Sequence, residues 1–497
     1  MAGIGFELQR LLKRGTLLAT IQAFVYGAMV ASGPMILTVI AVSVIGWLSR
    51  SLLSDGALKL FTLTITYTFA FSLILTAPFQ QLLTRYIADR YFAKDLRNLF
   101  GGFMTITAFV LGLALLVSGT FYRLLIVTVP LDNVALYKIA GVVVFIGQCF
   151  IWQLMAFIST SKEYQKIFLA YILGTIASIT SAFFFIKKIG VVGALAAYGV
   201  GQWLIALIIF WIVIRGLNKR RWVVLNVFKT FKQYPLIALN GFFMTLGIWI
   251  DKFVFYAHVR QTFGGNLFYS FTFYDVPSFL ALMSLVPAMT YFLILAETHF
   301  YTDFKKFIDN VLHHPLLKIE QKKHEMLDSL QTGMWGIARI QGVFSLLVII
   351  FAGPLVIFLG YQGLSIPLFR ILILASFFYI LTLTLNVFYL YFEFRKEALI
   401  MSMTFCIGNA LFTHVTALLG TRYYGLGMLI SALGTLLFFW PHLIRKVSRI
   451  DYMLFSQQPI EDAFETSRRA GVRRWLRHWK RKKPTREHEV EWTFTSF

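Results

Sequence analysis

Long apolar runs alternate with short polar segments along almost the whole chain. Each run holds about 20 residues, the length of helix that crosses a hydrocarbon core about 30 Å thick. Such runs predict membrane-spanning helices, because a helix satisfies its own backbone inside a bilayer. We therefore expect an all-α polytopic membrane protein with twelve transmembrane helices, at Leu17–Leu48, Leu58–Leu83, Gly102–Val129, Tyr137–Ser161, Ile167–Ile186, Val191–Ile214, Pro235–Val259, Asp275–His299, Met334–Leu359, Ser365–Phe392, Ala398–Leu419 and Tyr424–Ile444.

Lysine and arginine are unevenly divided between the two sets of connecting segments. The segments on the side of the N-terminus carry 22 of them even without the C-terminal tail, and those on the other side carry nine. Basic residues accumulate in cytoplasmic loops, so both termini are expected in the cytoplasm. The net charge of +23 thus reflects topology, and no nucleic-acid-binding motif accompanies it.

The composition agrees with a membrane protein, since 58% of the residues are hydrophobic and only 14% are charged. Its two cysteines lie far apart, with no spacing typical of a disulfide framework or a metal site. No outer loop is long enough for a catalytic domain, and no glycosyltransferase or metalloprotease motif is present. We expect no enzyme activity, no metal and no cofactor.

Features in the two halves of the chain recur in the same order. Glu163 matches Glu393 at an offset of 230 residues, and Gly193 matches Gly427 at an offset of 234. Six spans return a chain to its starting side, so this pattern favours two parallel six-helix repeats over chance similarity. The expected organisation is an interfacial amphipathic helix at 1–16, an N-terminal six-helix lobe at 17–215, a cytoplasmic linker at 216–234, a C-terminal six-helix lobe at 235–446 with a cytoplasmic loop at 301–333, and a basic cytoplasmic tail at 447–497.

An acid and a base stand side by side in the seventh apolar run, at Asp251 and Lys252. An uncompensated charge inside a bilayer costs at least about 2.5–3.5 kcal/mol, so both should face protein or water. Neighbouring side chains leave a helix about 100° apart, so we expect Lys252 to pair with Asp275 rather than with Asp251. The pair either lines a passage between the two lobes or fixes neighbouring helices.

Other polar and aromatic residues in the spans are candidates for the same path, although interhelical hydrogen bonds and interfacial aromatic belts explain such residues more often. Gly33 and Pro34 predict a kink in the first span, either a hinge or a static bend. The path candidates are Asp251, Lys252, Asp275, Asn240, Gln22, Gln148, Trp249 and Tyr256, with Tyr269 and Tyr274 as further rings on which a sugar could stack.

Two segments are candidates for binding partners. The loop at 301–333 is rich in charges of both signs and suits a helical docking surface, with Lys305, Lys306, Lys322 and Lys323 as its basic residues. The tail carries clustered Lys and Arg with Trp475 and Trp479 four residues apart. Such a segment suits anionic lipid, or it is simply solvated.

Several motifs, in order, resemble the PelG family over most of the chain to about residue 450. They are "MAGIGFEL" at the start, "SGP" at 32–34, "WIDKFVFY" at 249–256, "YDVPSFLALMSLVPAMTYFLILAETHFY" at 274–301 and "YLYFEFRKEAL" at 389–399. The resemblance implies an inner-membrane transporter of the Pel exopolysaccharide, within the multidrug/oligosaccharidyl-lipid/polysaccharide (MOP) flippase superfamily. It also implies a V-shaped pair of six-helix lobes around a central cavity.

The same resemblance implies partners: a cytosolic glycosyltransferase that builds an amino-sugar polymer, and two further inner-membrane subunits. The family's Asp-Lys falls on Asp251 and Lys252, and its Glu-Thr falls on Glu297 and Thr298. Three alternatives stay open, namely a flippase for lipid-linked oligosaccharides, an antiporter of the same superfamily, and a scaffold that recruits the polysaccharide synthase.

Overall fold

The computed structural model describes residues 17–456 except 94, 159–163, 216–222, 225–226, 296–299, 314 and 359–364. The interfacial helix expected at 1–16, and the tail beyond residue 456, lie outside this part. Within it, the chain is helical apart from short connections and isolated β-bridges. The helices are α2 (Leu17–Ser49), α3 (Asp55–Phe92), α4 (Leu96–Leu124), α5 (Val134–Ile158), α6 (Tyr164–Arg215), α7 (Phe228–Gln233), α8 (Pro235–Gly247), α9 (Ile250–Val259), α10 (Thr272–Met283), α11 (Val286–Leu295), α12 (Tyr301–His313), α13 (Leu316–Ile350), α14 (Ala352–Phe358), α15 (Ile366–Tyr391), α16 (Arg395–Leu419), η3 (Thr421–Tyr423), α17 (Leu426–Val447) and α18 (Ile450–Ser456).

Among the described residues, ten helices are long and apolar enough to cross a membrane, or eleven if α8 and α9 form one span. The longest, α6, consists of two helices that meet at Ile189 and Gly190. Gly190 has φ 56° and ψ −133°, a conformation that essentially only glycine adopts. The fifth and sixth spans predicted from the sequence, Ile167–Ile186 and Val191–Ile214, lie on either side of this point. The chain is therefore an all-helical, multi-pass membrane protein, while the count of twelve spans stays a prediction.

The seventh predicted span, Pro235–Val259, is not one helix. Helix α8 ends at Gly247 and α9 begins at Ile250, with a 50° bend between them. At Gly247 a β-carbon would meet the ring of Phe405 on α16 at 2.7 Å, so only glycine allows this approach. Asn409 of α16 donates its amide to the Gly247 carbonyl at 2.8 Å, which replaces a helical hydrogen bond lost at the break.

The eighth predicted span is also interrupted, between α10 and α11 at Ser284 and Leu285. Pro287 has no backbone N–H to donate to the preceding turn, which explains the interruption. Gln341 of α13 donates to the freed carbonyl of Ser284 at 3.0 Å. Both broken spans are therefore completed by an amide side chain from a neighbouring helix.

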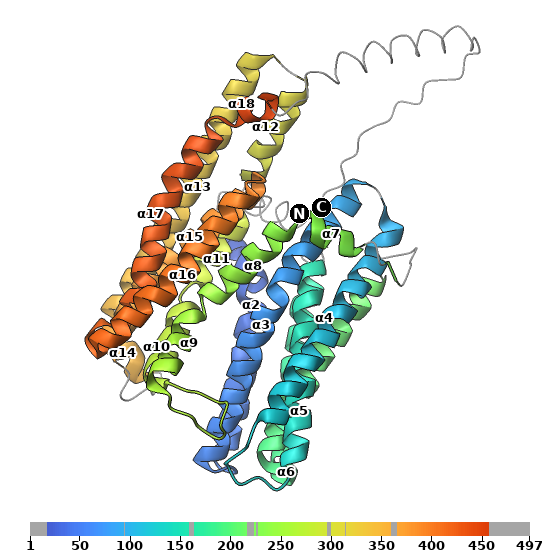
Figure 1. Ribbon diagram of the computed structural model, residues 1–497, viewed down its shortest axis with the longest axis vertical. Helices are drawn as coiled ribbons and strands as arrows, with labels where there is room; N and C mark the ends of the chain where they lie inside the picture. Colours follow the sequence, from blue (N-terminus) through green and yellow to red (C-terminus); the bar gives the residue numbers. More distant parts are fainter. Residues whose placement is uncertain are drawn as a thin grey trace, which may run out of the picture.

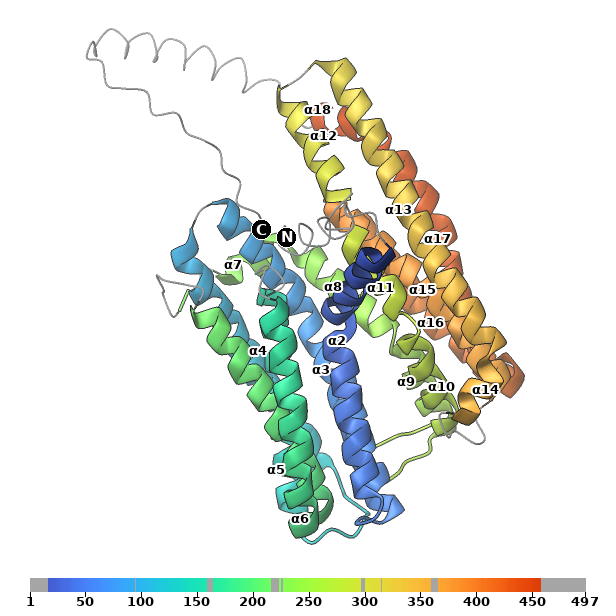
Figure 2. The ribbon, with the colours of Figure 1, turned by 180° about the vertical axis from the view of Figure 1, so that it is seen from behind.

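The loop predicted at 301–333 is helical, as expected from its sequence. It forms α12 and the first half of α13, and α13 continues without a break to Ile350. Figures 1 and 2 show α12 and the start of α13 extending beyond the other helices at the end where α18 lies.

The helices of the two parts of the chain pack in corresponding ways. In the first part, α3 and α4 pack on α5; in the second, α10 and α13 pack on α15. Likewise, α2 packs on α6 in the first part, and α8 packs on α16 in the second. Helices α8 and α9 run obliquely between the first five helices and α15–α17 (Figure 1), so α8 contacts both α3 and α16. Seen from behind (Figure 2), α2 crosses α11, which it also contacts. The boundaries of the predicted lobes stay a prediction.

Residues 260–271, here called the crossing loop, join α9 to α10 and reach across to the first helices (Figure 1). Val127 and Gly265 form an antiparallel bridge. Asn266 accepts a hydrogen bond from the backbone of Ile126 at 2.8 Å through its side chain. Phe268 is fully buried and lies edge-on to Tyr67 of α3, with ring centroids 5.0 Å apart. The crossing loop thus belongs, by its packing, to the core of the first helices.

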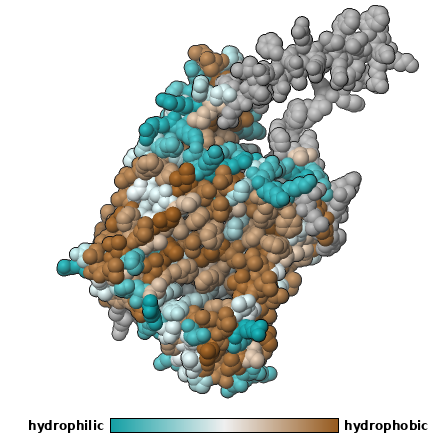
Figure 3. Space-filling model, in the orientation of Figure 1, coloured by the Kyte–Doolittle hydropathy of each residue, from teal (hydrophilic) through white to brown (hydrophobic). Residues whose placement is uncertain are grey.

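The surface matches a protein embedded in lipid. Large apolar side chains are exposed along α4, α6, α13, α16 and α17, where a soluble protein would bury them. Figure 3 shows apolar residues covering the middle of one face, with many hydrophilic residues toward the end that carries α7, α12 and α18.

Candidate functional site

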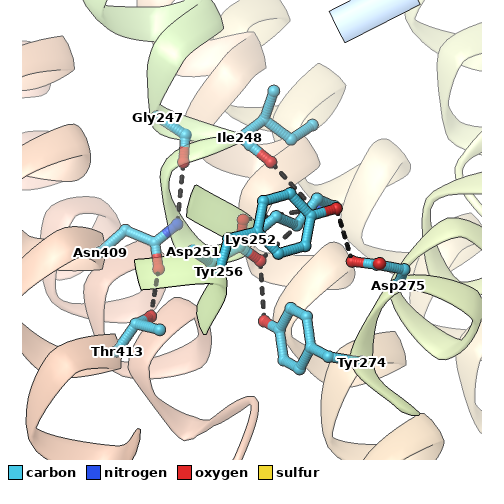
Figure 4. Close-up of polar contacts among 9 residues, drawn as sticks. All are labelled: Gly247, Ile248, Asp251, Lys252, Tyr256, Tyr274, Asp275, Asn409 and Thr413. Carbon is cyan, nitrogen blue, oxygen red and sulfur yellow. Dashed lines mark hydrogen bonds and ion pairs between the residues drawn. The ribbon is translucent and has the colours of Figure 1, made fainter. Parts of the chain in front are cut away.

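The charged pair lies in the first turn of α9, directly after the break in the seventh span. Asp251 is completely buried and Lys252 is only 5% exposed. Helices α10 and α16 approach the break from the two sides, so residues from three segments of the chain surround it (Figure 4). The expectation that both charges face protein rather than lipid agrees with this burial.

The partner predicted for Lys252 is wrong. Its ammonium lies 3.3 Å from Oδ1 of Asp251 and 3.3 Å from the carbonyl oxygen of Ile248. The angle of about 100° between neighbouring side chains describes only where they leave the helix. The four-carbon stem of a lysine is long enough to fold back toward the preceding residue. The break also leaves the Ile248 carbonyl available as a second acceptor, which draws the ammonium in this direction.

Asp251 has a second partner that the sequence did not assign to it. The hydroxyl of Tyr274, a fully buried residue of α10, donates to Oδ2 of Asp251 at 2.7 Å. Tyr274 entered the sequence analysis only as a ring that could stack on a sugar. Little in the sequence indicates this hydrogen bond, because 23 residues, including the crossing loop, separate Tyr274 from Asp251.

Asp275 lies at the same site but serves the start of α10. Its Oδ2 accepts the backbone N–H of Phe271 at 3.0 Å, and its Oδ1 accepts the hydroxyl of Tyr256 at 3.0 Å (Figure 4). It therefore caps a helix and ties α9 to α10 at the base of the crossing loop. Trp249 completes the site, with its ring centroid 5.3 Å from the ammonium of Lys252.

Asn409 and Thr413 of α16 support the break from the other side. Asn409 donates to Gly247, and the hydroxyl of Thr413 donates to the side-chain oxygen of Asn409 at 3.0 Å. Neither was among the predicted path residues. Both are fully or almost fully buried, and their hydrogen bonds fix the shape of the break.

The remaining path candidates belong to other contacts. Asn240 exchanges two amide hydrogen bonds with Asn386 of α15, at 3.0 and 2.9 Å. Gln148 lies among the first helices, 3.5 Å from the hydroxyl of Tyr198, and Gln22 is exposed on α2. The structure therefore brings together Asp251, Lys252, Asp275, Trp249 and Tyr256, and leaves these three glutamine and asparagine side chains elsewhere.

The candidate hinge and docking residues all lie within helices. Pro34 lies inside α2, and Gly33 packs closely against Phe168. Lys305 lies in α12, where Lys306 pairs with Asp303 at 3.1 Å. Their roles stay predictions.

Two lysines of α13 have partners within the chain. Lys322 pairs with Glu325 at 2.6 Å, and Lys323 pairs with Asp451 of α18 at 2.8 Å. Partial burial raises the pKa of Asp451, but hydrogen bonds from Lys323 and from backbone N–H groups outweigh it and hold that pKa below its ordinary value. The Lys323–Asp451 pair therefore fastens α18 to α13.

A second polar contact joins the first helices to the later ones at the other end of α3. Arg85 donates to Glu393, which also accepts from Arg395 at 2.7 Å. Both guanidinium groups lie over the ring of Tyr234, at 5.0 and 4.5 Å from its centroid. Glu393 has φ 59°, a left-handed conformation that is uncommon for a residue with a side chain. Backbone strain therefore coincides with this junction.

The described residues contain no group of three or more His, Cys, Asp or Glu side chains arranged to hold a metal ion. The site instead offers a buried pair of opposite charges, Lys252 and Asp251, with the carboxylate of Asp275 nearby. Removing one member of such a pair leaves an uncompensated buried charge and costs about 3–5 kcal/mol. Its ammonium and carboxylate can exchange partners with a polar molecule, which hydrocarbon side chains cannot do.

Comparison with solved structures shows a shared fold. A MOP superfamily transporter from Pyrococcus furiosus, described as having a binding pocket of reverse polarity, aligns with TM-score 0.55 and 16% identity over 86% of this chain and 96% of its own. A MATE protein in a bent conformation gives TM-score 0.57 and 14% identity over 86% and 96%. An inward-facing multidrug resistance MATE transporter gives 0.53 and 15% over 86% and 99%.

A comparison with curated proteins gave no match. The family comparison did: residues 1–455 match the PelG family, described as an exopolysaccharide exporter (EPS-E). The match includes both halves of the chain, the broken seventh and eighth spans and the buried ion pair. This chain belongs to the PelG family of exopolysaccharide exporters.

Proposed function

We propose that this protein moves a biofilm exopolysaccharide of the Pel type, an amino-sugar polymer, from the cytoplasm across the bacterial inner membrane, with both termini in the cytoplasm. Family membership supports the class of substrate. The excess of basic residues on the side of the termini supports the orientation. The ten spans become eleven when α8 and α9 are joined, and twelve when α6 is counted as two helices. That number fits a route between two six-helix lobes.

The observation that carries the proposal is the buried pair of Asp251 and Lys252 at a helix break. Transporters commonly place their sites at such breaks, near the boundary between two repeats. An ammonium donor beside a carboxylate acceptor matches the hydroxyl and amine groups of sugars. Trp249 and Tyr256 add aromatic faces on which sugar rings stack. A static ion pair would serve packing less well than apolar side chains of the same volume.

The proposed partners are a cytosolic glycosyltransferase and two further inner-membrane subunits. We place the glycosyltransferase contact on α12 and the start of α13, because these helices extend beyond the apolar part of the molecule. Anionic lipid is the proposed partner of the basic tail. These assignments draw on the family resemblance and on the charge pattern of the sequence.

The test measures secreted polysaccharide from cells that lack the protein and carry wild type, Asp251→Asn, Lys252→Met or the double variant. We expect each single variant to lower export at least about tenfold, because an unpaired charge remains at the site. The double variant removes both charges and should reach the membrane in near-normal amounts without restoring export. Lys59→Met, which removes a cation outside the site, is the matched control.

Abundance in the membrane and recruitment of the glycosyltransferase are measured in the same cells. Normal export by the double variant would show that the pair only fixes neighbouring helices. Normal export by the deletion strain would overturn polysaccharide transport altogether.

A further inference from the structure

The ammonium of Lys252 has the surroundings of a bound metal cation. Two carboxylate oxygens of Asp251 lie 3.3 and 3.5 Å away, and the Ile248 carbonyl oxygen lies 3.3 Å away. The ring of Trp249 is near enough for a cation–π contact, at 5.3 Å. All of these groups belong to one short stretch of the chain, the break itself and the first turn of α9.

The break explains why a backbone oxygen takes part. Inside a continuous helix the Ile248 carbonyl would accept an N–H four residues later, whereas here its recorded partner is the lysine. The neighbouring carbonyl, of Gly247, is already occupied by Asn409. Unwound carbonyls together with carboxylates are the ligands with which broken membrane helices hold Na⁺.

The ammonium of Lys252 is also shared among several oxygens rather than fixed in one short hydrogen bond. Charge-assisted N–H···O bonds are about 2.7–2.9 Å long. The three contacts of the Lys252 ammonium are all longer and nearly equal. Tyr274 meanwhile makes the short hydrogen bond to Asp251, at 2.7 Å, and keeps the carboxylate in place.

We propose that Lys252 is a tethered cation, whose ammonium fills a monovalent-cation site formed by Asp251 and the Ile248 carbonyl. The chain therefore binds no free Na⁺ or K⁺ at this position. If the protein is the transporter proposed above, movement of its substrate is not coupled to a cation at this site. The cation site itself does not depend on that function, and its test uses the purified protein.

The test removes the ammonium and offers an ion in its place. In Lys252→Ala the carboxylate and the carbonyl remain, and the space of the side chain is vacant. We expect Na⁺ or K⁺ to raise the thermal unfolding midpoint of full-length Lys252→Ala in detergent by on the order of 3 °C, saturably, relative to N-methylglucamine at equal ionic strength. Wild type should show no such difference. Li⁺, Na⁺, K⁺ and Rb⁺ are compared to establish size selectivity.

Two variants separate the site from general salt effects. Lys252→Met fills most of the vacant space with an apolar chain, so its response to the ions should be much smaller. Asp251→Asn with Lys252→Ala keeps the space but removes the anion, and its response should vanish. Binding of radioactive ²²Na⁺, with one ion per chain in Lys252→Ala and none in wild type at this site, gives a second readout.

The proposal is overturned if wild type responds to Na⁺ or K⁺ as strongly as Lys252→Ala, or if the shift persists without the Asp251 carboxylate. It also fails if Lys252→Ala folds and none of the four ions stabilises it. Should Lys252→Ala not fold, Lys252→Ser is used in the same series, and the wild-type arm remains decisive. Loss of polysaccharide export would bear only on the proposed function, because none of these measurements involves the polymer.

Discussion

Single residues at the break illustrate what a sequence can and cannot show. The cost of burying charge was enough to predict that Asp251 and Lys252 face protein, and both are buried. Their mutual pairing could not be predicted, because it depends on a backbone carbonyl that becomes available only when the helix breaks. The role of Tyr274 likewise depends on how α10 packs against α9.

Replacing Tyr274 by Phe should lower the free energy of unfolding of the protein. The change removes a 2.7 Å hydrogen bond to a buried carboxylate and adds no volume. Hydrogen bonds to charged groups contribute about 1.5–3 kcal/mol, so we expect a loss of free energy of unfolding in that range. Denaturant unfolding in detergent measures it.

Tyr379→Phe is the matched control for this loss. Tyr379 is a buried tyrosine of α15 whose ring packs on Phe405. Equal losses for the two variants would show that the hydroxyl of Tyr274 contributes nothing special to Asp251.

At the scale of elements, hydropathy located the helices well because each span must satisfy its backbone alone. The breaks were missed for two different reasons. Pro287 was a visible signal for the interruption after Met283, since helices end near a following proline. Gly247 was not, because glycines are common in membrane helices and the compensating Asn409 lies 162 residues away.

The docking of α18 on α13 should depend on pH. The folded-state pKa of Asp451 is lowered, so its stabilising contribution is fully present above the ordinary value of 3.8 and is lost as the pH falls below it. A spin label at Tyr452→Cys, an exposed position, should become more mobile as the pH falls from about 5 to about 2.

Asp451→Asn provides the comparison for this titration. It should be mobile at both pH values, because the ion pair with Lys323 is absent throughout. A wild-type label that stays immobile at about pH 2 would mean that apolar packing alone holds α18.

For the whole molecule, α3 is the main link between the first helices and the later ones. Tyr67 exchanges two hydrogen bonds with the backbone of Tyr269 in the crossing loop, at 2.7 and 3.0 Å. Arg85 contacts Glu393 eighteen residues, or about 27 Å, further along the same helix. We expect the route to open where the crossing loop separates from α3, a motion that breaks the first of these contacts.

Fixing the crossing loop should therefore stop export. Lys59 lies over the ring of Phe263, 4.1 Å from its centroid, so cysteines at these two positions can be joined by a short bismaleimide. The native Cys149 and Cys406 are buried and are replaced by alanine. We expect the crosslinked protein to export at least about tenfold less than the same protein before crosslinking, a change in rate that corresponds to a free energy of roughly 1.4 kcal/mol.

Each single-cysteine variant treated with the same reagent controls for its chemical effect. Undiminished export by the crosslinked pair would show that the crossing loop stays in place during transport.

Helix α13 runs unbroken for 35 residues, which is about 52 Å, whereas a bilayer core is about 30 Å thick. Its exposed tip, at Leu316 and Leu317, and its buried Gln341 therefore move as parts of one stiff rod. We therefore expect a displacement of the tip to reach Ser284, where Gln341 holds the break in the eighth span. Helix α13 would then couple the polar end of the molecule to the interior of the membrane.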